Sequence, residues 1–276
     1  MTSNDRFLEV AVRAARAGGT VLRRRIGSLK PAQIRKKGRY DWVTDADHAS
    51  EEEILRIVRG AFPAHSVRAE ESGASGGSSG YEWLIDPLDG TVNYMHRFPM
   101  FAVSIALAYQ GQVQVGVVLD PVRGELFTAR RGGGARLNGK RIRVTGCSSF
   151  ERALLATGFP FRAKELIALY LRSFRRVFLE TGSIRRAGSA AMDLAYVACG
   201  RMDGFWEMAL SPWDVAAGAL LIEEAGGRVS DFFGGPDYLS TGHILAGTPA
   251  LHRKMVRLLT PIFRGRMNEA RTCGTE

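Results

Sequence analysis

The chain has 276 residues, 45% of them hydrophobic and 24% charged, a balance that is typical of a folded globular protein. It contains no run of about 18 apolar residues and no secretory signal at its start, and its three cysteines lack metal-like spacing, so we expect a cytoplasmic protein with reduced thiols. The formal net charge of +10 is dispersed over short clusters without interleaved aromatic residues, which does not by itself indicate a nucleic-acid-binding surface.

An amphipathic helix is predicted at the start of the chain, from about Asp5 to Arg25. Apolar residues recur there at helical spacing, with arginines on the other side. Lys30-Pro31 ends this pattern. The basic stretch from Ile34 to Tyr40 is expected to form a hairpin or a mobile loop.

A second helix is predicted to begin at Thr44 or Asp45 and to reach about Ala61. Either residue suits the N-cap position, because Thr and Asp side chains accept hydrogen bonds from free backbone amides. Carboxylates at a helix start mostly serve as caps or as partners of the helix dipole. Asp47 lies one turn further in, so it faces either solvent or a site.

An acidic pair follows the next predicted strand, which is short and covers Val67 to Ala69. Glu70 and Glu71 stand at the end of this strand, before a glycine- and serine-rich linker from Ser72 to Gly80. Adjacent glutamates are usually solvated. Their position at a strand end favours the interpretation that one of them reaches a cation bound near the next strand.

The stretch that begins with the apolar run Trp83–Ile85 has the strongest features of a functional site. The run predicts a buried strand, and Pro87 is expected to end it, because proline cannot donate a ladder hydrogen bond. Asp86 and Asp89 stand three residues apart across this turn, and two converging carboxylates require a hard cation between them. Gly90-Thr91 leads into a short helix whose free amides suit an anion. A cation site beside an anion site is what phosphate-ester chemistry requires.

Two other interpretations of this stretch remain. Asp-Pro and Asp-Gly are ordinary turn dipeptides, and most such pairs have no further function. Phosphatases with an aspartyl nucleophile place two aspartates two apart before Gly-Thr. Here the spacing is three, and Pro87 directly follows the first carboxylate, which disfavours a covalent nucleophile.

The rest of the sequence alternates between strand and helix patterns. Strands are predicted near residues 103–107, 113–119, 126–128, 154–156, 203–206, 228–230 and 243–246. Helices are predicted over residues 164–180, from about 190 to 199, over 211–225 and after Pro249. Gly132–Gly134 lacks the flanking strand and helix of a nucleotide-binding loop and is interpreted as a turn. The histidines have no metal-ligand spacing.

Two acidic residues stand at the ends of these later elements. Glu207 closes the predicted strand over residues 203–206. Asp214 lies in the first turn of the helix that Ser211-Pro212 opens, where a cap or a dipole partner needs no special function.

Four segments of the sequence occur together in one known family. They are Asp41–Asp47, Glu70–Ser72, Trp83–Asn93 and Trp213–Gly218, in this order. With these motifs the chain resembles the inositol monophosphatase family, within the lithium-sensitive, magnesium-dependent phosphatases. The resemblance covers about residues 7–259. The region from 153 to 227 is most similar to bacterial members, a group that includes proteins linked to transcription antitermination.

The resemblance implies a site with two or three Mg²⁺ ions. One ion would bind Glu70, Asp86 and the carbonyl oxygen of Leu88. A second would bind Asp86, Asp89 and Asp214, and Glu70 would contribute to a weaker third. Hard carboxylate and carbonyl oxygens are the ligands that Mg²⁺ selects.

The resemblance also implies how substrate and water bind. The amides of Gly90 and Thr91 would hold the phosphate, and Thr91 would pair with Asp47 to orient the attacking water. Lys36 would lie on a mobile loop that covers the metals. The sugar-alcohol hydroxyls would contact three residues of the second half: Ser189, Ala190 and Glu207.

The predicted fold is mixed α/β, a layered α-β-α-β-α sandwich of the inositol monophosphatase and fructose-1,6-bisphosphatase type. Residues 1–150 would form an N-terminal half that carries the metal and phosphate motifs. Residues 151–262 would form a C-terminal α/β half that completes the site, and residues 263–276 a disordered tail.

The implied reaction is hydrolysis of a phosphate monoester, first of all myo-inositol 1-phosphate, by metal-activated water. One alternative is a broader sugar or nucleotide phosphatase, acting on fructose 1,6-bisphosphate or on 3′(2′),5′-bisphosphate nucleotides. Another is an antitermination factor that binds RNA polymerase or RNA and retains a phosphatase site. A homodimer is expected from the resemblance alone.

Overall fold

The computed structural model describes residues 3–38 and 40–264 of the chain. Its α-helices are Ser3–Arg25 (α1), Asp45–Ala61 (α2), Thr91–Met95 (α3), Ile167–Phe178 (α4), Ala190–Ala198 (α5), Pro212–Glu224 (α6), Tyr238–Thr241 (α7) and Pro249–Phe263 (α8). Short 3₁₀ turns cover Pro31–Gln33 and Lys164–Leu166. The long helices lie where the apolar spacing predicts them.

The strands form a hairpin and two sheets. The hairpin pairs Ile34–Gly38 (β1) with Asp41–Thr44 (β2). An eight-stranded sheet has the order Lys140–Arg141 (β10), Gly134–Leu137 (β9), Glu125–Arg130 (β8), Gln112–Asp120 (β7), Ala102–Tyr109 (β6), Tyr81–Asp89 (β5), Ser66–Ala69 (β3) and Gly73–Ser75 (β4). A five-stranded sheet has the order Ser183–Arg185 (β12), Leu154–Thr157 (β11), Gly204–Glu207 (β13), Ile244–Gly247 (β15) and Arg228–Ser230 (β14).

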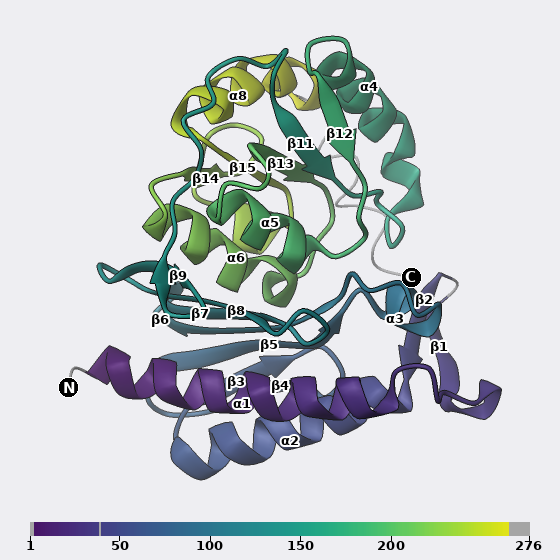
Figure 1. Ribbon diagram of the computed structural model, residues 1–276, viewed down its shortest axis with the longest axis vertical. Coiled ribbons are helices and arrows are strands. Elements are labelled where there is room, and N and C mark those ends of the chain that lie inside the picture. The colour runs from purple at the N-terminus through teal and green to yellow at the C-terminus, as the bar shows by residue number, and fades with distance from the viewer. Residues whose placement is uncertain (1–2, 39, 265–276) are drawn as a thin grey trace.

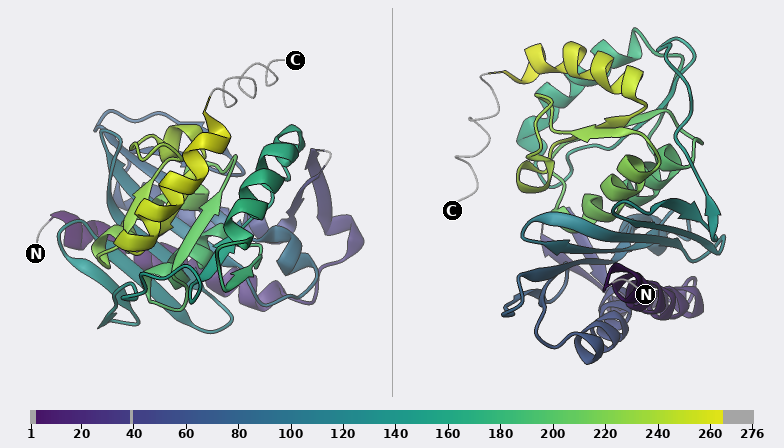
Figure 2. Two further views of the ribbon diagram at one scale, coloured as in Figure 1. Left: turned by 90° about the horizontal axis from the view of Figure 1, so that it is seen from above. Right: turned by 90° about the vertical axis from the view of Figure 1, so that its left-hand side faces the viewer.

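Helices and sheets alternate in layers (Figure 1). Helices α1 and α2 cover the outer face of the eight-stranded sheet, and α5 and α6 lie between the two sheets. Helices α4 and α8 cover the outer face of the five-stranded sheet, at the end of the molecule opposite α1 and α2 (Figure 2). The predicted α-β-α-β-α sandwich is confirmed.

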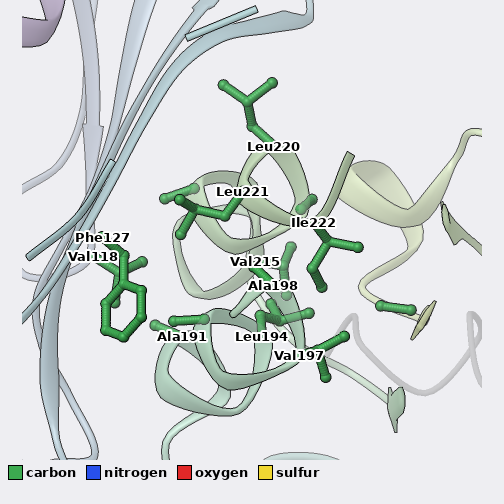
Figure 3. Close-up of a cluster of buried hydrophobic side chains, with 14 of the residues drawn as sticks. Val118, Phe127, Ala191, Leu194, Val197, Ala198, Val215, Leu220, Leu221 and Ile222 are labelled. Carbon is green, nitrogen blue, oxygen red and sulfur yellow. The ribbon is translucent and has the colours of Figure 1, made fainter. Parts of the chain in front are cut away.

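The layers are held together by apolar side chains on the facing surfaces. Between α1 and α2 and the large sheet, Phe7, Leu22 and Trp83 are buried, while the arginines of α1 stay on its outer side. Between the sheets, α5 and α6 are apolar on all sides and pack against Val118 and Phe127 (Figure 3). Burying each large apolar side chain contributes roughly 1.5–3 kcal/mol, so these contacts fix the position of α5 and α6, which carry site residues.

Strand β5 does not end at Pro87 as predicted but continues to Asp89. Its pairing with β6 is irregular between Asp86, which faces Ser104, and Asp89, which faces Ala102. The extra residue makes a bulge, so the missing amide of Pro87 falls where the ladder is interrupted and pairing resumes beyond it. The prediction was wrong because a bulge accommodates proline within a strand.

Several short elements were missing from the predictions: β4, β9, β10, β12 and α7, each of two to four residues. Phe263, placed in the predicted tail, is instead the buried last residue of α8. Residues 265–276 lie outside the described residues. The chain passes from the large sheet to the small one between Arg141 and Leu154, but the division into two halves near residue 150 stays a prediction.

Over the described ranges, no helix is both long and apolar enough to cross a membrane.

Cys147 and Cys199 are free thiols, and Cys273 lies outside the described residues. His65 has a structural role, because its Nδ1 accepts a hydrogen bond of 3.1 Å from the Trp83 indole and its ring stacks on Phe62 and Tyr81.

Candidate active site

A cavity of about 380 Å³ lies where segments of both sheets meet. It brings together ten of the residues that the sequence nominates: Glu70, Asp86, Leu88, Asp89, Gly90, Thr91, Ser189, Ala190, Glu207 and Asp214. Two nominated residues are not in its lining. Asp47 is fully buried behind Thr91, and Lys36 lies on β1, with its ammonium 5.0 Å from the centre of the Trp42 ring.

The bulge of β5 forms the floor of the cavity. Asp86 is buried there, and its Oδ1 accepts a hydrogen bond of 2.9 Å from the Leu88 amide, which holds the turn around Pro87. Gly90 lies between the end of β5 and the start of α3, where it is the N-cap residue, and its φ of 93° is a left-handed conformation. A Cβ atom here would lie 3.0 Å from the Met100 carbonyl oxygen, so glycine is required for both conformation and space.

Asp47 joins the start of α2 to Thr91. Its Oδ2 accepts hydrogen bonds from the Thr44 amide and hydroxyl at 2.9 and 2.6 Å, which completes a capping box. Its Oδ1 accepts a hydrogen bond of 3.0 Å from the Thr91 hydroxyl, which also lies 3.2 Å from the Leu88 carbonyl oxygen. Asp47 therefore caps α2 and also binds Thr91. The sequence left open whether its side chain faces solvent or a site, and in the structure it faces the site.

Glu70 lies on the turn between β3 and β4 and contacts two cationic side chains. Its Oε1 lies 3.2 Å from the Lys37 ammonium and 2.8 Å from the Arg162 guanidinium. Arg162 also reaches Asp214, at 3.7 Å, and Lys37 lies 2.5 Å from Glu71. These two cations neutralise part of the negative charge of the cavity.

Asp89 and Asp214 are each held by the start of a helix. Asp89 Oδ2 accepts hydrogen bonds from the Ser189 hydroxyl at 2.5 Å and the Ala191 amide at 2.8 Å, at the N-terminus of α5. Asp214 Oδ2 accepts a bond of 2.8 Å from the Ser211 amide at the N-terminus of α6. The hydrogen of the Ser189 hydroxyl is thus committed to Asp89, and this hydroxyl can only accept from a substrate.

The carboxylates of the cavity repel one another in a buried environment. Burial, followed by the charges of Glu70, Asp89 and Asp214, raises the pKa of Asp86 well above its usual value. Burial raises the pKa of Asp89 to about 6, against hydrogen bonds that lower it, and raises the pKa of Asp214 to about 7. A concentration of negative charge of this kind attracts a cation.

Residues 3–263 match the family model described as the inositol monophosphatase family. The chain belongs to the inositol monophosphatase family. The predicted resemblance is thereby confirmed over nearly all of the described chain.

Several known proteins are similar to this chain over almost their whole length. A Pseudomonas aeruginosa protein named Nus factor SuhB is 50% identical over 260 residues, which cover 92% of this chain and 96% of the relative. The extragenic suppressor protein suhB from Bartonella henselae has a TM-score of 0.88 and 42% identity over 94% of this chain and 99% of its own. An inositol monophosphatase from Anabaena has a TM-score of 0.85 and 44% identity over 94% and 97% of the two chains.

The residues of this site fit Mg²⁺, because the negatively charged atoms that could coordinate a metal ion are all carboxylate oxygens. As the side chains stand in the described part of the chain, no three of its Asp, Glu, His or Cys residues are close enough together to hold a metal ion. In this arrangement protein donors hold one oxygen of each of three carboxylates: Arg162 binds Glu70, Ser189 binds Asp89 and the Ser211 amide binds Asp214. A metal ion would compete with these donors for the same atoms.

Two functional features of the cavity were not found by sequence reasoning. Arg162, which joins Glu70 to Asp214, follows β11 in a Phe-Pro-Phe-Arg segment whose only signal is its position after a buried strand. Gly158 leaves room for Glu207, because a Cβ atom at this position would lie 1.9 Å from Glu207 Oε1. Both features depend on contacts between segments that are distant in the sequence.

In a metal chelator, we expect the melting temperature to fall as the pH rises from about 5 to about 8. The pKa values of Asp47 and Asp89, about 6, and of Asp214, about 7, are raised above the usual 3.8. The folded protein therefore binds more protons than the unfolded chain in this range. The stability that these groups contribute is complete below about pH 4 and is lost as the pH passes through 6 to 7.

The measurement is a series of thermal melts at fixed ionic strength, with EDTA and with saturating Mg²⁺. Mg²⁺ should reduce the fall, because a bound cation offsets the repulsion between ionised carboxylates. A melting temperature that is constant or rises from pH 5 to 8 in EDTA would contradict the raised pKa values.

Proposed function

We propose that this protein is a Mg²⁺-dependent phosphate monoester hydrolase, with myo-inositol 1-phosphate as the preferred substrate. The observation that carries the proposal is the single cavity that gathers the four carboxylates beside the Gly90-Thr91 turn, with Asp47 behind Thr91. Two or three Mg²⁺ ions would bind Glu70, Asp86, Asp89, Asp214 and the Leu88 carbonyl oxygen. Family membership and the similarity to an Anabaena inositol monophosphatase support it.

The chain's own residues would perform distinct tasks in this reaction. The chemistry that bound Mg²⁺ supplies is neutralisation of phosphate charge and activation of water. The Gly90 and Thr91 amides, at the start of α3, would hold phosphate oxygens. The Thr91 hydroxyl donates its hydrogen to Asp47, which leaves its lone pairs free to accept a proton from the attacking water. The β1–β2 hairpin, which carries Lys36, would close over the metals.

A panel assay at fixed Mg²⁺ tests the proposal directly. The substrates are inositol 1-phosphate, fructose 1,6-bisphosphate and adenosine 3′,5′-bisphosphate, and kcat/KM is compared among them. The highest value for inositol 1-phosphate, together with inhibition by Li⁺, supports the proposed function. A preference for either bisphosphate would favour the broader phosphatase, and no turnover of any of them would refute the proposal.

Glu207 is the residue expected to select a polyol. It closes β13, lines the cavity, and its carboxylate can accept hydrogen bonds from neighbouring hydroxyls of a sugar alcohol. Burial, followed by the charges of Asp193 and Asp89, raises the pKa of Glu207 well above its usual value. Glu207→Gln should therefore reduce kcat/KM for inositol 1-phosphate by roughly two- to tenfold, because a hydrogen bond between neutral groups contributes roughly 0.5–1.5 kcal/mol. An aryl phosphate without hydroxyls is the control substrate. Equal losses on both substrates would show that Glu207 serves the fold or the metals instead.

A second candidate function is binding of RNA polymerase or RNA, with the phosphatase site retained. It is favoured by the name Nus factor of the Pseudomonas aeruginosa relative, which is 50% identical. The test is capture of RNA polymerase or structured RNA by the wild type and by Asp89→Asn. Binding that survives the substitution supports this function, and absence of binding by either protein opposes it. A cytoplasmic location would suit both candidate functions.

We also propose that the protein is a homodimer. A stripe of large apolar side chains is exposed on and directly after α4: Ile167, Leu171, Phe178 and Leu179, at 43–62% exposure. Exposed apolar patches of this kind are typical of association surfaces. Sedimentation equilibrium at micromolar concentration should give twice the mass of the chain, and Leu171→Asp should halve it. A wild type that stays monomeric would contradict the dimer.

A further inference from the structure

One face of α2 contacts two separate segments of the active site, the turn of residues 70–72 and the stretch from Pro87 to Thr91. Asp47, Ser50 and Glu51 stand at helical positions i, i+3 and i+4, which place them on the same side. All three are buried, with at most 3% of their surface exposed. Asp47 binds Thr91, as described above, whereas Ser50 and Glu51 have no place yet in the proposed reaction.

Glu51 binds the turn that carries Glu70. The turn consists of residues 70–72, between β3 and β4. The Glu71 and Ser72 amides donate hydrogen bonds to the two carboxylate oxygens of Glu51, at 2.9 and 2.8 Å. The remaining amide of the turn, that of Glu70, donates to the Ile85 carbonyl oxygen at 3.1 Å. Every amide of the turn is therefore bound, two of them by Glu51.

Ser50 binds the bulge that carries the aspartates. Its hydroxyl donates a hydrogen bond of 2.9 Å to the Pro87 carbonyl oxygen. This carbonyl lies in the interval between Asp86 and Asp89 where β5 and β6 are not in regular register. Ser50 therefore supplies a donor to a carbonyl at the interruption of the ladder, on the residue between Asp86 and Leu88, two proposed metal ligands.

We propose that Ser50 and Glu51 are positioning residues, which hold the Glu70 turn and the Asp86–Asp89 bulge at the separation that Mg²⁺ binding requires. The inference rests on the proposed function. The opposite side of α2 supports it by contrast: Glu52 is exposed, and Glu53 pairs with Arg56 on the same helix. The polar contacts to the site thus come from one side of α2, and they reach two segments, residues 70–72 and the stretch from Pro87 to Thr91.

A purely structural role predicts a different result from a positioning role. Glu51 bonds to the turn through a buried carboxylate, which makes these bonds charge-assisted and strong. If they only stabilise the fold, their loss lowers stability and leaves the Mg²⁺ affinity of the folded protein unchanged. If they hold Glu70 in place, Mg²⁺ affinity falls, since changes to groups that orient metal ligands typically cost about 10–100-fold.

The experiment compares Glu51→Gln with Glu52→Gln, the same chemical change on the next, exposed residue. Isothermal titration of Mg²⁺ into each protein without substrate gives the Kd, and thermal melts in EDTA give the stability. The glutamine at 51 offers one acceptor and one donor group to two amides, so one amide loses its partner. We expect the Mg²⁺ Kd to rise about tenfold or more for Glu51→Gln and to stay at the wild-type value for Glu52→Gln.

Ser50→Ala provides a second test if Glu51→Gln does not fold. It removes one hydroxyl, and we expect a several-fold rise in the Mg²⁺ Kd because the Pro87 carbonyl loses its donor. Wild-type Mg²⁺ affinity in every variant that folds, whatever its melting temperature, would overturn the inference. A wild type that binds no Mg²⁺ would instead refute the proposed function on which the inference depends.

Discussion

Asp89→Asn is expected to lower kcat by about a thousandfold or more while leaving the fold intact. Asparagine has the same shape, and its carbonyl oxygen can still accept the hydrogen bonds that the Ser189 hydroxyl and the Ala191 amide donate to Asp89. What is lost is one negative charge in the proposed Mg²⁺ site. Metal ions stabilise transition-state charge by several kcal/mol, and each 1.36 kcal/mol corresponds to about tenfold in rate.

The measurement is kcat at saturating Mg²⁺, together with the melting temperature in EDTA. The melting temperature should not fall, because the substitution removes one charge from a group of buried carboxylates that repel one another. Asp237→Asn is the matched control, since Asp237 is exposed before α7 and outside the cavity. An Asp89→Asn variant with wild-type kcat, or full wild-type activity in EDTA, would contradict the metal assignment.

Thr91→Ala and Asp47→Asn are each expected to lower kcat by roughly 10²–10⁴-fold, with KM nearly unchanged, if the pair acts as the general base. Thr91 serves as a base only while a carboxylate accepts its hydrogen, which Asp47 Oδ1 does at 3.0 Å. In Asp47→Asn, the side-chain oxygen of the asparagine must face the Thr44 donors. Its side-chain NH₂ group then faces Thr91 and donates a hydrogen bond to the Thr91 hydroxyl. The direction of this hydrogen bond is then reversed, and a Thr91 lone pair is occupied.

Because the two residues form one unit, the double variant should lose little more than either single variant. Thr44→Ala is the control for the capping role, because Thr44 donates to Oδ2 of Asp47, whereas Thr91 donates to Oδ1. Losing this cap should cost about 0.5–2 kcal/mol of stability with a much smaller effect on kcat. Additive losses in the Thr91–Asp47 cycle would refute the pair and leave Asp47 as a helix cap only.

Most long elements of this fold could be predicted because their signals are local. The start of α2 follows from a Thr at the N-cap and an Asp three residues later, which form a capping box. By contrast, β4 and β12 have three residues each and no distinctive pattern. They are strands only because a partner strand lies beside them, which is a property of the assembled sheet.

The candidate site shows the same division. The acidic residues at strand and helix ends were identified in the sequence, and the resemblance assigned them to metals. Ser50 and Glu51 were not identified, because polar residues on a helix usually face solvent, and only the position of α2 against the large sheet shows that these two face inward. Arg162 was missed for a similar reason.

By itself, the sequence determined the helices, their caps and the chemical type of the ligands, because these depend on residues within a few positions of one another. It also determined the family, because each of the four motifs is a short continuous segment. Only the tertiary structure decided which groups meet. Thr91 binds Asp47 across 44 residues of sequence, Arg162 binds Glu70 across 92, and Ser189 binds Asp89 across 100. Such contacts are set by the order of strands in the sheets and by the packing of helices between them, which no local interaction specifies.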